Sequence, residues 1–270
     1  MDYFQALVLA AIQGLTEFLP VSSSAHLILV PTFLGWEDQG LAFDVAVHVG
    51  TLLAVLFYFK QDLLKIISSW FGGWSGLSWD QQGLLGWWIV VATIPVGLVG
   101  LAAGDWIELN LRSALVIACT TFVFGLALAW ADRRALSNNG TLDTINYKQA
   151  FTVGAAQALA LIPGTSRSGI TMTAMLALGY SRTAAARFSF LLSIPAISLP
   201  GLLKGVELSQ KTTPVAWDVL IIGVIVSAAV ALLCIRVFMR FVERVGMMPF
   251  VYYRIGLAVV ILVFAWNTVG

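Results

Sequence analysis

Charged side chains are scarce in this 270-residue chain, at 11 % of the total, whereas apolar residues make up 59 % and the mean hydropathy is +0.90. A soluble domain of this size with so few charges would be poorly hydrated. Most of the surface must therefore face lipid. Only helices or closed barrels satisfy the backbone in lipid, and the chain is predicted to be an all-α integral membrane protein. The net charge of +1 argues against a nucleic-acid partner and against a peripheral basic surface.

Cysteine is scarce, with two residues in the chain, and a recognised phosphate-loop motif is lacking. Cys119 and Cys234 each lie in an apolar run without the spacing of a zinc or redox motif, so we expect small core or lipid-facing residues. The glycine-rich stretch 71–76 lacks the lysine of a phosphate-binding loop and is predicted to be a flexible interfacial loop. Met1-Asp2-Tyr3 has no basic region before its apolar stretch, so this N-terminus is not expected to be a cleaved signal peptide.

What the chain has in abundance is long runs without any charge. A membrane crossing needs about 20 residues, so each run is expected to borrow a few flanking positions, and tryptophans near the ends are expected to anchor the interfaces. We predict six transmembrane helices, over 45–59, 81–104, 113–131, 188–203, 219–235 and 255–270.

One stretch of the sequence occurs twice, at a constant offset of 144 (147 minus 3). Each copy contains a polar segment inside an apolar region. We call these segments the first polar loop, 20–26, and the second polar loop, 163–169. Aligning Pro20 with Pro163 places Arg167 opposite Ser24. The repeated residues are Tyr3, Gln5, Ala6, Ala11, Gln13 and Leu15, which recur as Tyr147, Gln149, Ala150, Ala155, Gln157 and Leu159.

Polar, non-helical backbone is tolerated at membrane depth only where protein or a water-filled cavity surrounds it. We therefore expect each copy, 3–36 and 147–180, to form a re-entrant helix-loop-helix hairpin that enters and leaves on one side. Three spans separate the hairpins, so the second must enter from the opposite face. The chain is predicted to be a single membrane domain, 1–270, with inverted repeat halves of about 1–134 and 147–270, and a site between them.

The distribution of Lys and Arg predicts the orientation, because cations near span ends collect in the cytoplasm. With both termini extracytoplasmic, eleven cations fall on the inner side and three on the outer, leaving out Arg167. The outer three are Arg112, Lys204 and Lys211, and the inner eleven are Lys60, Lys65, Arg133, Arg134, Lys148, Arg182, Arg187, Arg236, Arg240, Arg244 and Arg254.

Ionisable side chains within membrane segments are candidates for function, and here they are Glu17, His26, Asp44, His48 and Arg167. If a helix restarts at the serines, Ser23 and His26 share a face, and imidazole would activate the hydroxyl as a nucleophile. A structural role is the alternative for that pair. Asp44 and His48 could line the same cavity, but a satisfied polar pair in the bundle interior is the preferred interpretation.

The side chains of Gln13 and Glu17 lie four residues apart and point towards the first polar loop. Such an oxygen pair suits a hard divalent cation, Mg²⁺ or Ca²⁺, which would bridge phosphate oxygens. The alternative is a structural hydrogen-bonded pair between the hairpins. Because only one of the two residues is charged, tight binding of a metal by the protein alone is not expected.

The second polar loop is predicted to bind phosphate. It precedes a helix N-terminus, where amides and hydroxyls attract anions, and Arg167 adds a fork of donors. An Arg167–Glu17 pair that holds the hairpins together is the structural alternative, and both arrangements could occur in turn. The expected phosphate-binding residues are Ser22 of the first loop with Gly164, Thr165, Ser166 and Ser168 of the second.

The segments 13–26, QGLTEFLPVSSSAH, and 163–169, PGTSRSG, closely resemble the two signatures of undecaprenyl-diphosphate phosphatases of the bacitracin-resistance type. The similarity covers essentially the whole chain. Ser24 and Ala25 stand where threonine and glycine are common in that family, and Gln13 fills the first position of its glutamate-rich element. The resemblance implies a nucleophilic Ser23, a catalytic His26 and Glu17, and a phosphate-binding Arg167.

The resemblance also implies an activity and a place in the cell. The expected reaction is hydrolysis of undecaprenyl diphosphate to undecaprenyl phosphate, the lipid carrier for peptidoglycan, in the bacterial plasma (inner) membrane. Ser23 would attack the terminal phosphorus with His26 as base, or water would attack directly. The expected partners are the polyprenyl diphosphate, membrane lipids and, as an open alternative, a second copy of the chain.

Two other functions are alternatives to this one. Lipid phosphatases of the acid-phosphatase superfamily need a histidine after the arginine, and the only two histidines here are His26 and His48. A prenyl-phosphate transporter or flippase could use the same inverted hairpins and the same Arg167, but it would not need Ser23.

Overall fold

The structure is a computed structural model that describes residues 1–74, 78–135, 139–209 and 216–269. Within these ranges the regular elements are helices, with one isolated bridge between Gly140 and Tyr180. They are α1 (Tyr3–Thr16), α2 (Ser23–Leu34), α3 (Gly40–Tyr58), α4 (Lys60–Trp74), α5 (Gln81–Asn110), α6 (Ala114–Arg134), η2 (Leu142–Thr144), α7 (Tyr147–Ala158), η3 (Leu159–Leu161), α8 (Arg167–Ala177), α9 (Arg182–Ser209), α10 (Trp217–Val245) and α11 (Met248–Val269).

Six of the described helices are long and apolar enough to cross a membrane: α3, α5, α6, α9, α10 and α11. They coincide with the six uncharged runs, so the prediction of an all-α, multi-pass membrane protein is confirmed. Each helix reaches beyond its run at one end or at both. Cys119 is exposed and Cys234 is buried, and both are free thiols, as expected of lipid-facing and core positions.

Helix α4 was not predicted. Its first turns carry charges, and Asp62 forms an ion pair with Arg187 of α9 at 2.8 Å, while Ile66 is buried. The predicted interfacial loop over 71–76 is wrong for residues 71–74, which continue α4; the remainder of that stretch lies outside the described residues. Side-chain packing against α5 therefore overrides the local effect of Gly72 and Gly73.

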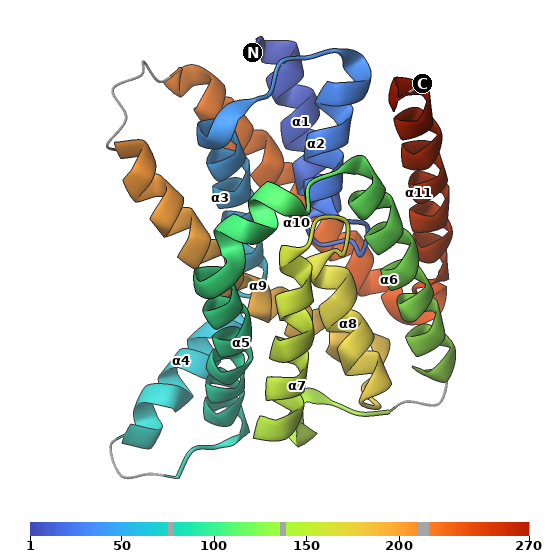
Figure 1. Cartoon of the computed structure of the whole chain (residues 1–270). Helices are drawn as coiled ribbons and strands as arrows, with labels where there is room; N and C mark the ends of the chain where they lie inside the picture. The colour runs from blue at the N-terminus through green and yellow to red at the C-terminus, as the bar shows by residue number, and fades with distance from the viewer. Residues whose placement is uncertain (75–77, 136–138, 210–215, 270) are drawn as a thin grey trace.

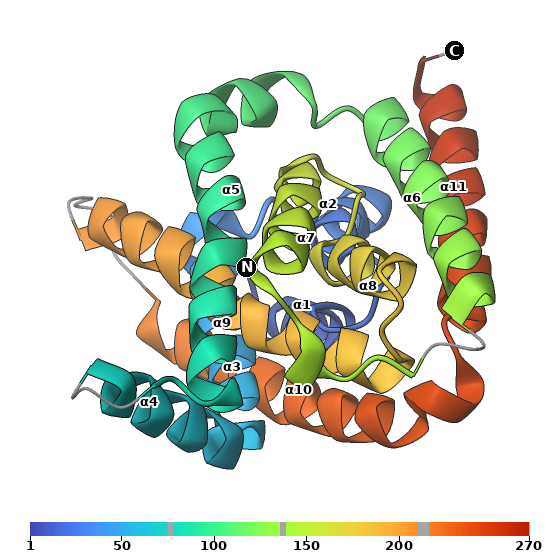
Figure 2. The ribbon, with the colours of Figure 1, turned by 90° about the horizontal axis from the view of Figure 1, so that it is seen from below.

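Two helical hairpins, α1–α2 and α7–α8, point towards each other from opposite ends of the molecule (Figure 1). Both chain termini lie at the end from which α1 and α2 extend. Seen from below, the α7–α8 hairpin stands in the middle of the molecule, encircled by α5, α6, α10 and α11 (Figure 2). The two polar loops thus meet inside the ring of long helices.

The same local structure recurs in both hairpins at equivalent positions of the repeat. Asp2 and Asn146 each form a capping box, with Gln5 and Gln149 respectively, at the start of α1 and α7. At the far end of each hairpin, Gly35 and its counterpart in the second copy have positive φ angles of 64° and 96°. Equivalent sequence positions therefore begin and end the two hairpins in the same way.

Small residues allow the hairpins to pack closely against long helices. α1 packs on α10 and α7 packs on α5. A Cβ atom at Gly14 would lie 2.6 Å from the Ser227 carbonyl oxygen, and one at Gly154 would lie 2.7 Å from Ala92 Cα. Glycine at these positions lets the backbones approach directly, as small residues do between membrane helices.

Candidate active site

Each polar loop contains a serine with the same unusual backbone directly before the following helix. Ser22 and Ser166 have φ angles of 72° and 70°, a region that residues other than glycine rarely adopt, and each directly precedes a helix. Ser166 Oγ accepts a hydrogen bond from Gly169 N at 3.2 Å and so caps α8. Both loops therefore aim the first residue of the following helix into the same space.

This geometry corrects the alignment of the two loops. The two positive-φ serines are separated by the same offset as the rest of the repeat, so the register continues through the loops without a slip. The hydroxyl pairs agree: Ser22 lies 3.3 Å from Ser24, and Ser166 lies 3.3 Å from Ser168. Arg167 is consequently the counterpart of Ser23, not of Ser24.

Glu17, directly after α1, connects the two hairpins. Its Oε1 accepts a hydrogen bond from Arg167 Nη2 at 2.8 Å, and its Oε2 accepts one from Ser23 Oγ at 2.7 Å. Gln13 Nε2 also donates to Oε2, at 3.0 Å. The carboxylate side chain is only 6 % exposed, so its charge depends on Arg167 for compensation. Both predicted structural pairs, Gln13–Glu17 and Arg167–Glu17, are present.

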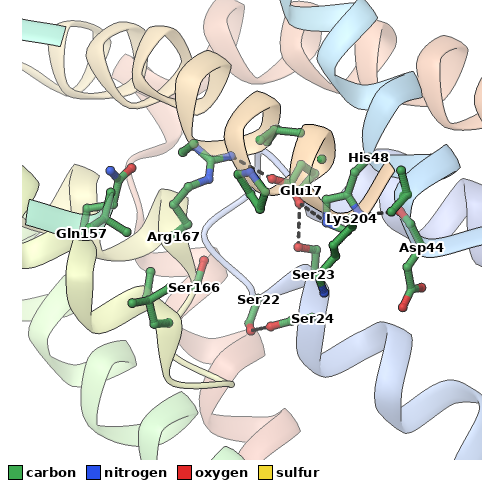
Figure 3. Close-up of a pocket in the computed structure, with 18 residues that line it drawn as sticks. Glu17, Ser22, Ser23, Ser24, Asp44, His48, Gln157, Ser166, Arg167 and Lys204 are labelled. Carbon is green, nitrogen blue, oxygen red and sulfur yellow. Dashed lines mark hydrogen bonds and ion pairs between the residues drawn. The ribbon is translucent and has the colours of Figure 1, made fainter. Parts of the chain in front are cut away.

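Arg167 is itself held in place from α9. Its Nη1 donates to the Ser189 carbonyl oxygen at 3.2 Å, and the Ser189 hydroxyl lies 2.7 Å from Thr171 Oγ1 of α8. These contacts fix the guanidinium beside the cavity that Arg167 lines. Figure 3 shows Ser23 and Arg167 reaching Glu17 from two sides.

A cavity of about 310 Å³ lies against this cluster and is lined by both polar loops and by α3, α5 and α9. Both polar and apolar side chains line it. The polar lining residues are Glu17, Ser22, Ser23, Ser24, Asp44, His48, Gln157, Ser166, Arg167 and Lys204, and the apolar lining residues include Val45, Val96, Leu161, Ile197 and Pro200.

The predicted phosphate-binding residues separate into two groups. Ser22 and Ser166 line the cavity with Arg167. Gly164, Thr165 and Ser168 are buried behind it, and the Ser168 hydroxyl donates to the Leu19 carbonyl oxygen at 2.8 Å. These three residues shape the loop, and the structure does not bring their side chains to the cavity.

The histidines differ from the expected arrangement. The ring of His26 is buried and bonds the Ser22 carbonyl oxygen through Nδ1, at 2.7 Å, and the Tyr253 hydroxyl through Nε2, at 2.6 Å. Both ring nitrogens are therefore engaged away from Ser23. His26 fixes the strained end of the first polar loop against α11.

His48, by contrast, lines the cavity. Its Nδ1 bonds the Asp44 carbonyl oxygen at 2.7 Å, and its Nε2 lies 3.8 Å from Glu17 Oε2. The Asp44 carboxylate accepts from Gln39 Nε2 at 2.8 Å and also lines the cavity. Asp44 and His48 are thus hydrogen-bonded to each other, as in the preferred interpretation, and they also line the cavity, as in the alternative.

An oxygen site for a divalent cation is only partly assembled. Among the described residues no group of three or more His, Cys, Asp or Glu side chains is placed to hold a metal ion. Gln13 Oε1 is buried without a hydrogen-bond partner and could supply one oxygen, and Glu17 could supply another. These two residues fit a cation only when a bound phosphate completes the ligands.

Arg254 of α11 is a site component that the sequence did not predict, because by position it resembles an inner flanking cation. It is fully buried and donates to the carbonyl oxygens of both polar loops and of α6. Its five acceptors are Pro20, Thr120, Thr121, Gly164 and Thr165, at 3.0–3.5 Å. Arg254 therefore fastens the two loops together from behind.

Gln157 and Lys204 also line the cavity without having been predicted. The repeat contained a signal for Gln157, since it is the counterpart of Gln13. Both amide atoms of Gln157 are buried without a hydrogen-bond partner. For Lys204 the sequence contained no signal of a place in the cavity, because by position it resembles an outer flanking cation.

Known proteins match this chain along nearly its whole length. The family model described as bacitracin resistance protein BacA matches residues 6–260. A protein named undecaprenyl-diphosphatase 1 from Pseudoalteromonas translucida is 53 % identical over 264 residues, which cover 98 % of this chain and 99 % of the relative. An undecaprenyl-diphosphatase from Alcanivorax borkumensis is 56 % identical over 267 residues, covering 97 % and 98 %. The chain belongs to the bacitracin resistance protein BacA family.

Proposed function

We propose that this protein is an undecaprenyl-diphosphatase, a membrane hydrolase that converts undecaprenyl diphosphate to undecaprenyl phosphate and inorganic phosphate. The names of relatives that are 53 % and 56 % identical over nearly the full length support this substrate. The observation that carries the chemistry is the hydrogen-bonded series Ser23–Glu17–Arg167, which joins both hairpins at a cavity.

The substrate is expected to bind with its diphosphate near Ser23 and Arg167 and its isoprenoid tail against apolar lining residues such as Val96 and Ile197. The terminal phosphate would take over the guanidinium donors of Arg167 from Glu17. Phosphate offers the planar guanidinium the same paired acceptors as a carboxylate does, so the exchange conserves charge-assisted hydrogen bonds. Ser22 and Ser166 would contribute hydroxyls at the loop ends.

The reaction would then begin at Ser23. Its hydroxyl already donates to Glu17 Oε2, so Glu17 is placed to receive the proton as Oγ forms a bond to the terminal phosphorus. The bond from phosphorus to the bridging oxygen breaks, and undecaprenyl phosphate leaves with the electron pair. Water then cleaves the phosphoserine, and Arg167 stabilises the charge that develops on the phosphoryl oxygens.

This assignment changes the expected role of His26. The predicted transfer of the Ser23 proton to His26 needs a contact that the observed side-chain positions do not provide. We propose that His26 positions the loop and that Glu17 is the proton acceptor. A divalent cation, held by Glu17, Gln13 Oε1 and the substrate, would offset phosphate charge when bound.

We further propose that the protein resides in the bacterial plasma membrane with both termini extracytoplasmic. The halves 1–134 and 147–270 would form an inverted repeat with two re-entrant hairpins, which is supported by the shared caps and loop geometry. A homodimer stays a prediction.

Phosphate release from undecaprenyl diphosphate by the purified protein tests the proposal. We expect Ser23→Ala to lower kcat by about 10³-fold or more, because no other hydroxyl of the described residues is bonded to Glu17. Ser24→Ala is the matched control: it removes a neighbouring hydroxyl that contacts only Ser22 in the described structure, and it should retain most of the activity. Acid quenching during turnover should trap phosphate on Ser23.

Three outcomes would change the assignment. Full activity of Ser23→Ala would exclude the serine as nucleophile. Loss of activity without trapped phosphoserine, under conditions where it should accumulate, would favour direct attack by water. No phosphate release by the parent protein would favour the prenyl-phosphate transporter instead.

A further inference from the structure

A second cavity, of about 360 Å³, opens between α6 and α11 away from the proposed active site. We call it the α6–α11 groove. Two adjacent arginines from the last turn of α6 line one end of it, and aliphatic and aromatic side chains line the rest. Its residues are Leu126, Ala129, Trp130, Arg133, Arg134, Met248, Val251, Tyr252 and Ile255.

The polar end of the groove carries unbalanced positive charge. Arg133 and Arg134 are both exposed, and no acidic residue is paired with either of them in the described part of the chain. The neighbouring acid, Asp132, is buried and turned away, because it binds Arg182 at 2.6 Å. The guanidinium of Arg134 lies 4.5 Å from the centre of the Trp130 ring, which holds it at the groove.

The apolar end lies along two helices that are long and apolar enough to cross the membrane. Val251 is buried at its base, while Leu126 and Tyr252 are exposed at its sides. A ligand that fits both ends needs an anionic, phosphate-like head and a hydrocarbon body. A pair of arginines beside a tryptophan at a helix end is the arrangement that recognises such a head group.

We propose that the α6–α11 groove binds an anionic phospholipid of the surrounding bilayer, with the phosphodiester at Arg133 and Arg134 and an acyl chain along Leu126, Val251 and Ile255. The ligand would bridge the two helices that support the active site from behind. In α11, Tyr252 faces the groove, and the next two residues are Tyr253, which bonds His26, and Arg254, which bonds both polar loops. An occupant of the groove would therefore brace the segment that fixes the loops.

The test uses the full-length protein in detergent, titrated with phosphatidylglycerol or phosphatidylcholine and followed by native mass spectrometry and thermal unfolding. We expect phosphatidylglycerol to bind and to raise the melting temperature more than phosphatidylcholine does. The double variant Arg133→Gln/Arg134→Gln should lose about 10-fold or more in affinity for phosphatidylglycerol. Its melting temperature without added lipid should match that of the parent.

Arg236→Gln/Arg240→Gln is the control, because it removes the same charge from two exposed arginines of α10 that do not line the groove. It should keep the parent's affinity. Equal losses in both double variants would mean general attraction to anionic lipid and would overturn the proposal, as would equal binding of the two lipids. Neither readout needs substrate, so failure here is distinguishable from failure of the phosphatase assignment.

Discussion

Arg167 and Arg254 are both held by several hydrogen bonds, but their acceptors differ in kind. Arg167 is paired with a carboxylate beside a cavity, and in the proposed mechanism a phosphate replaces that partner. Arg254 is surrounded by carbonyl oxygens from three segments and is fully buried. Carbonyl oxygens are neutral, so they do not cancel the positive charge of Arg254. Its N–H donors, however, are used within the protein. We therefore assign Arg254 a structural role.

Arg254→Lys tests this role. Lysine keeps the charge but has three donors on one atom, so it cannot reach acceptors spread over both loops and α6. Buried carbonyls left without donors should lower the free energy of unfolding by roughly 2–4 kcal/mol. Thermal unfolding in detergent measures the loss, and phosphate release should fall with it because the loops lose their register.

Arg133→Lys is the comparison, since Arg133 is exposed. It should leave the melting temperature nearly unchanged. If Arg254→Lys behaves like Arg133→Lys, the five carbonyl contacts do not hold the loops.

The sequence identified Glu17, Ser23 and Arg167 because charge and hydroxyl groups are conspicuous in an apolar chain. It did not identify which way a side chain points. Ser23 and His26 share a helix, yet the imidazole turns to Tyr253, far away in the chain, and His48 enters the cavity instead. Such long-range partners have no local signal, and the same holds for Arg254.

The positions of helices were predictable where a single physical requirement determines them. Spanning a bilayer demands about 20 apolar residues, so the uncharged runs located the six long helices. α4 has no such requirement: it carries Lys60, Asp62 and Lys65 in its first turns, and its packing on α5 is a tertiary effect. The tips of the hairpins were predictable only in part. The prolines predicted where the helices break, but nothing in the sequence predicted the positive φ of Ser22 and Ser166.

Direct contact between backbones positions α7, and Gly154→Ala tests its importance. The added Cβ would meet the backbone of Ala92 in α5, which cannot move as a side-chain tip can. We expect a loss of about 1–3 kcal/mol in the free energy of unfolding and a lower rate of phosphate release, since Gln157 lies one turn further along α7. Gly97→Ala, in α5 where a Cβ meets nothing within 4 Å, is the matched control.

The Gly97 variant should be neutral or slightly stabilising, because alanine favours helix more than glycine does. Thermal unfolding of the two variants side by side separates steric overlap from helix propensity. Equal stability of the two would show that α7 and α5 can separate without cost.

Across the whole molecule, the arrangement of the hairpins is what produces the asymmetric site from similar parts. Both loops present the residue after a positive-φ serine to one cavity, and those residues are Ser23 from one side and Arg167 from the other. The same backbone thus delivers a hydroxyl and a cation to one place. Neither hairpin alone contains the whole Ser23–Glu17–Arg167 series, so the proposed chemistry depends on docking of the hairpins.

The distribution of the cations predicts the orientation of the molecule in the membrane. Arg254 is buried and no longer counts as a flanking residue, which lowers the inner total from eleven to ten, and Lys211 lies outside the described residues. The excess remains at the end of the molecule opposite to both termini, and loops rich in Lys and Arg stay in the cytoplasm. Both termini, with the α2–α3 connection, should therefore be extracytoplasmic.

Single cysteines report this orientation in intact cells. Glu37→Cys, in the exposed α2–α3 connection, should react with a membrane-impermeant maleimide, and Lys148→Cys, at the exposed start of α7, should react only after the membrane is opened. The exposed Cys119 is first replaced by serine, whereas Cys234 is buried and can stay. Because the two positions lie at opposite ends of the molecule, they must give opposite results in any single orientation. The reverse pattern would place both termini in the cytoplasm, and labelling of both residues in intact cells would contradict the membrane-spanning arrangement itself.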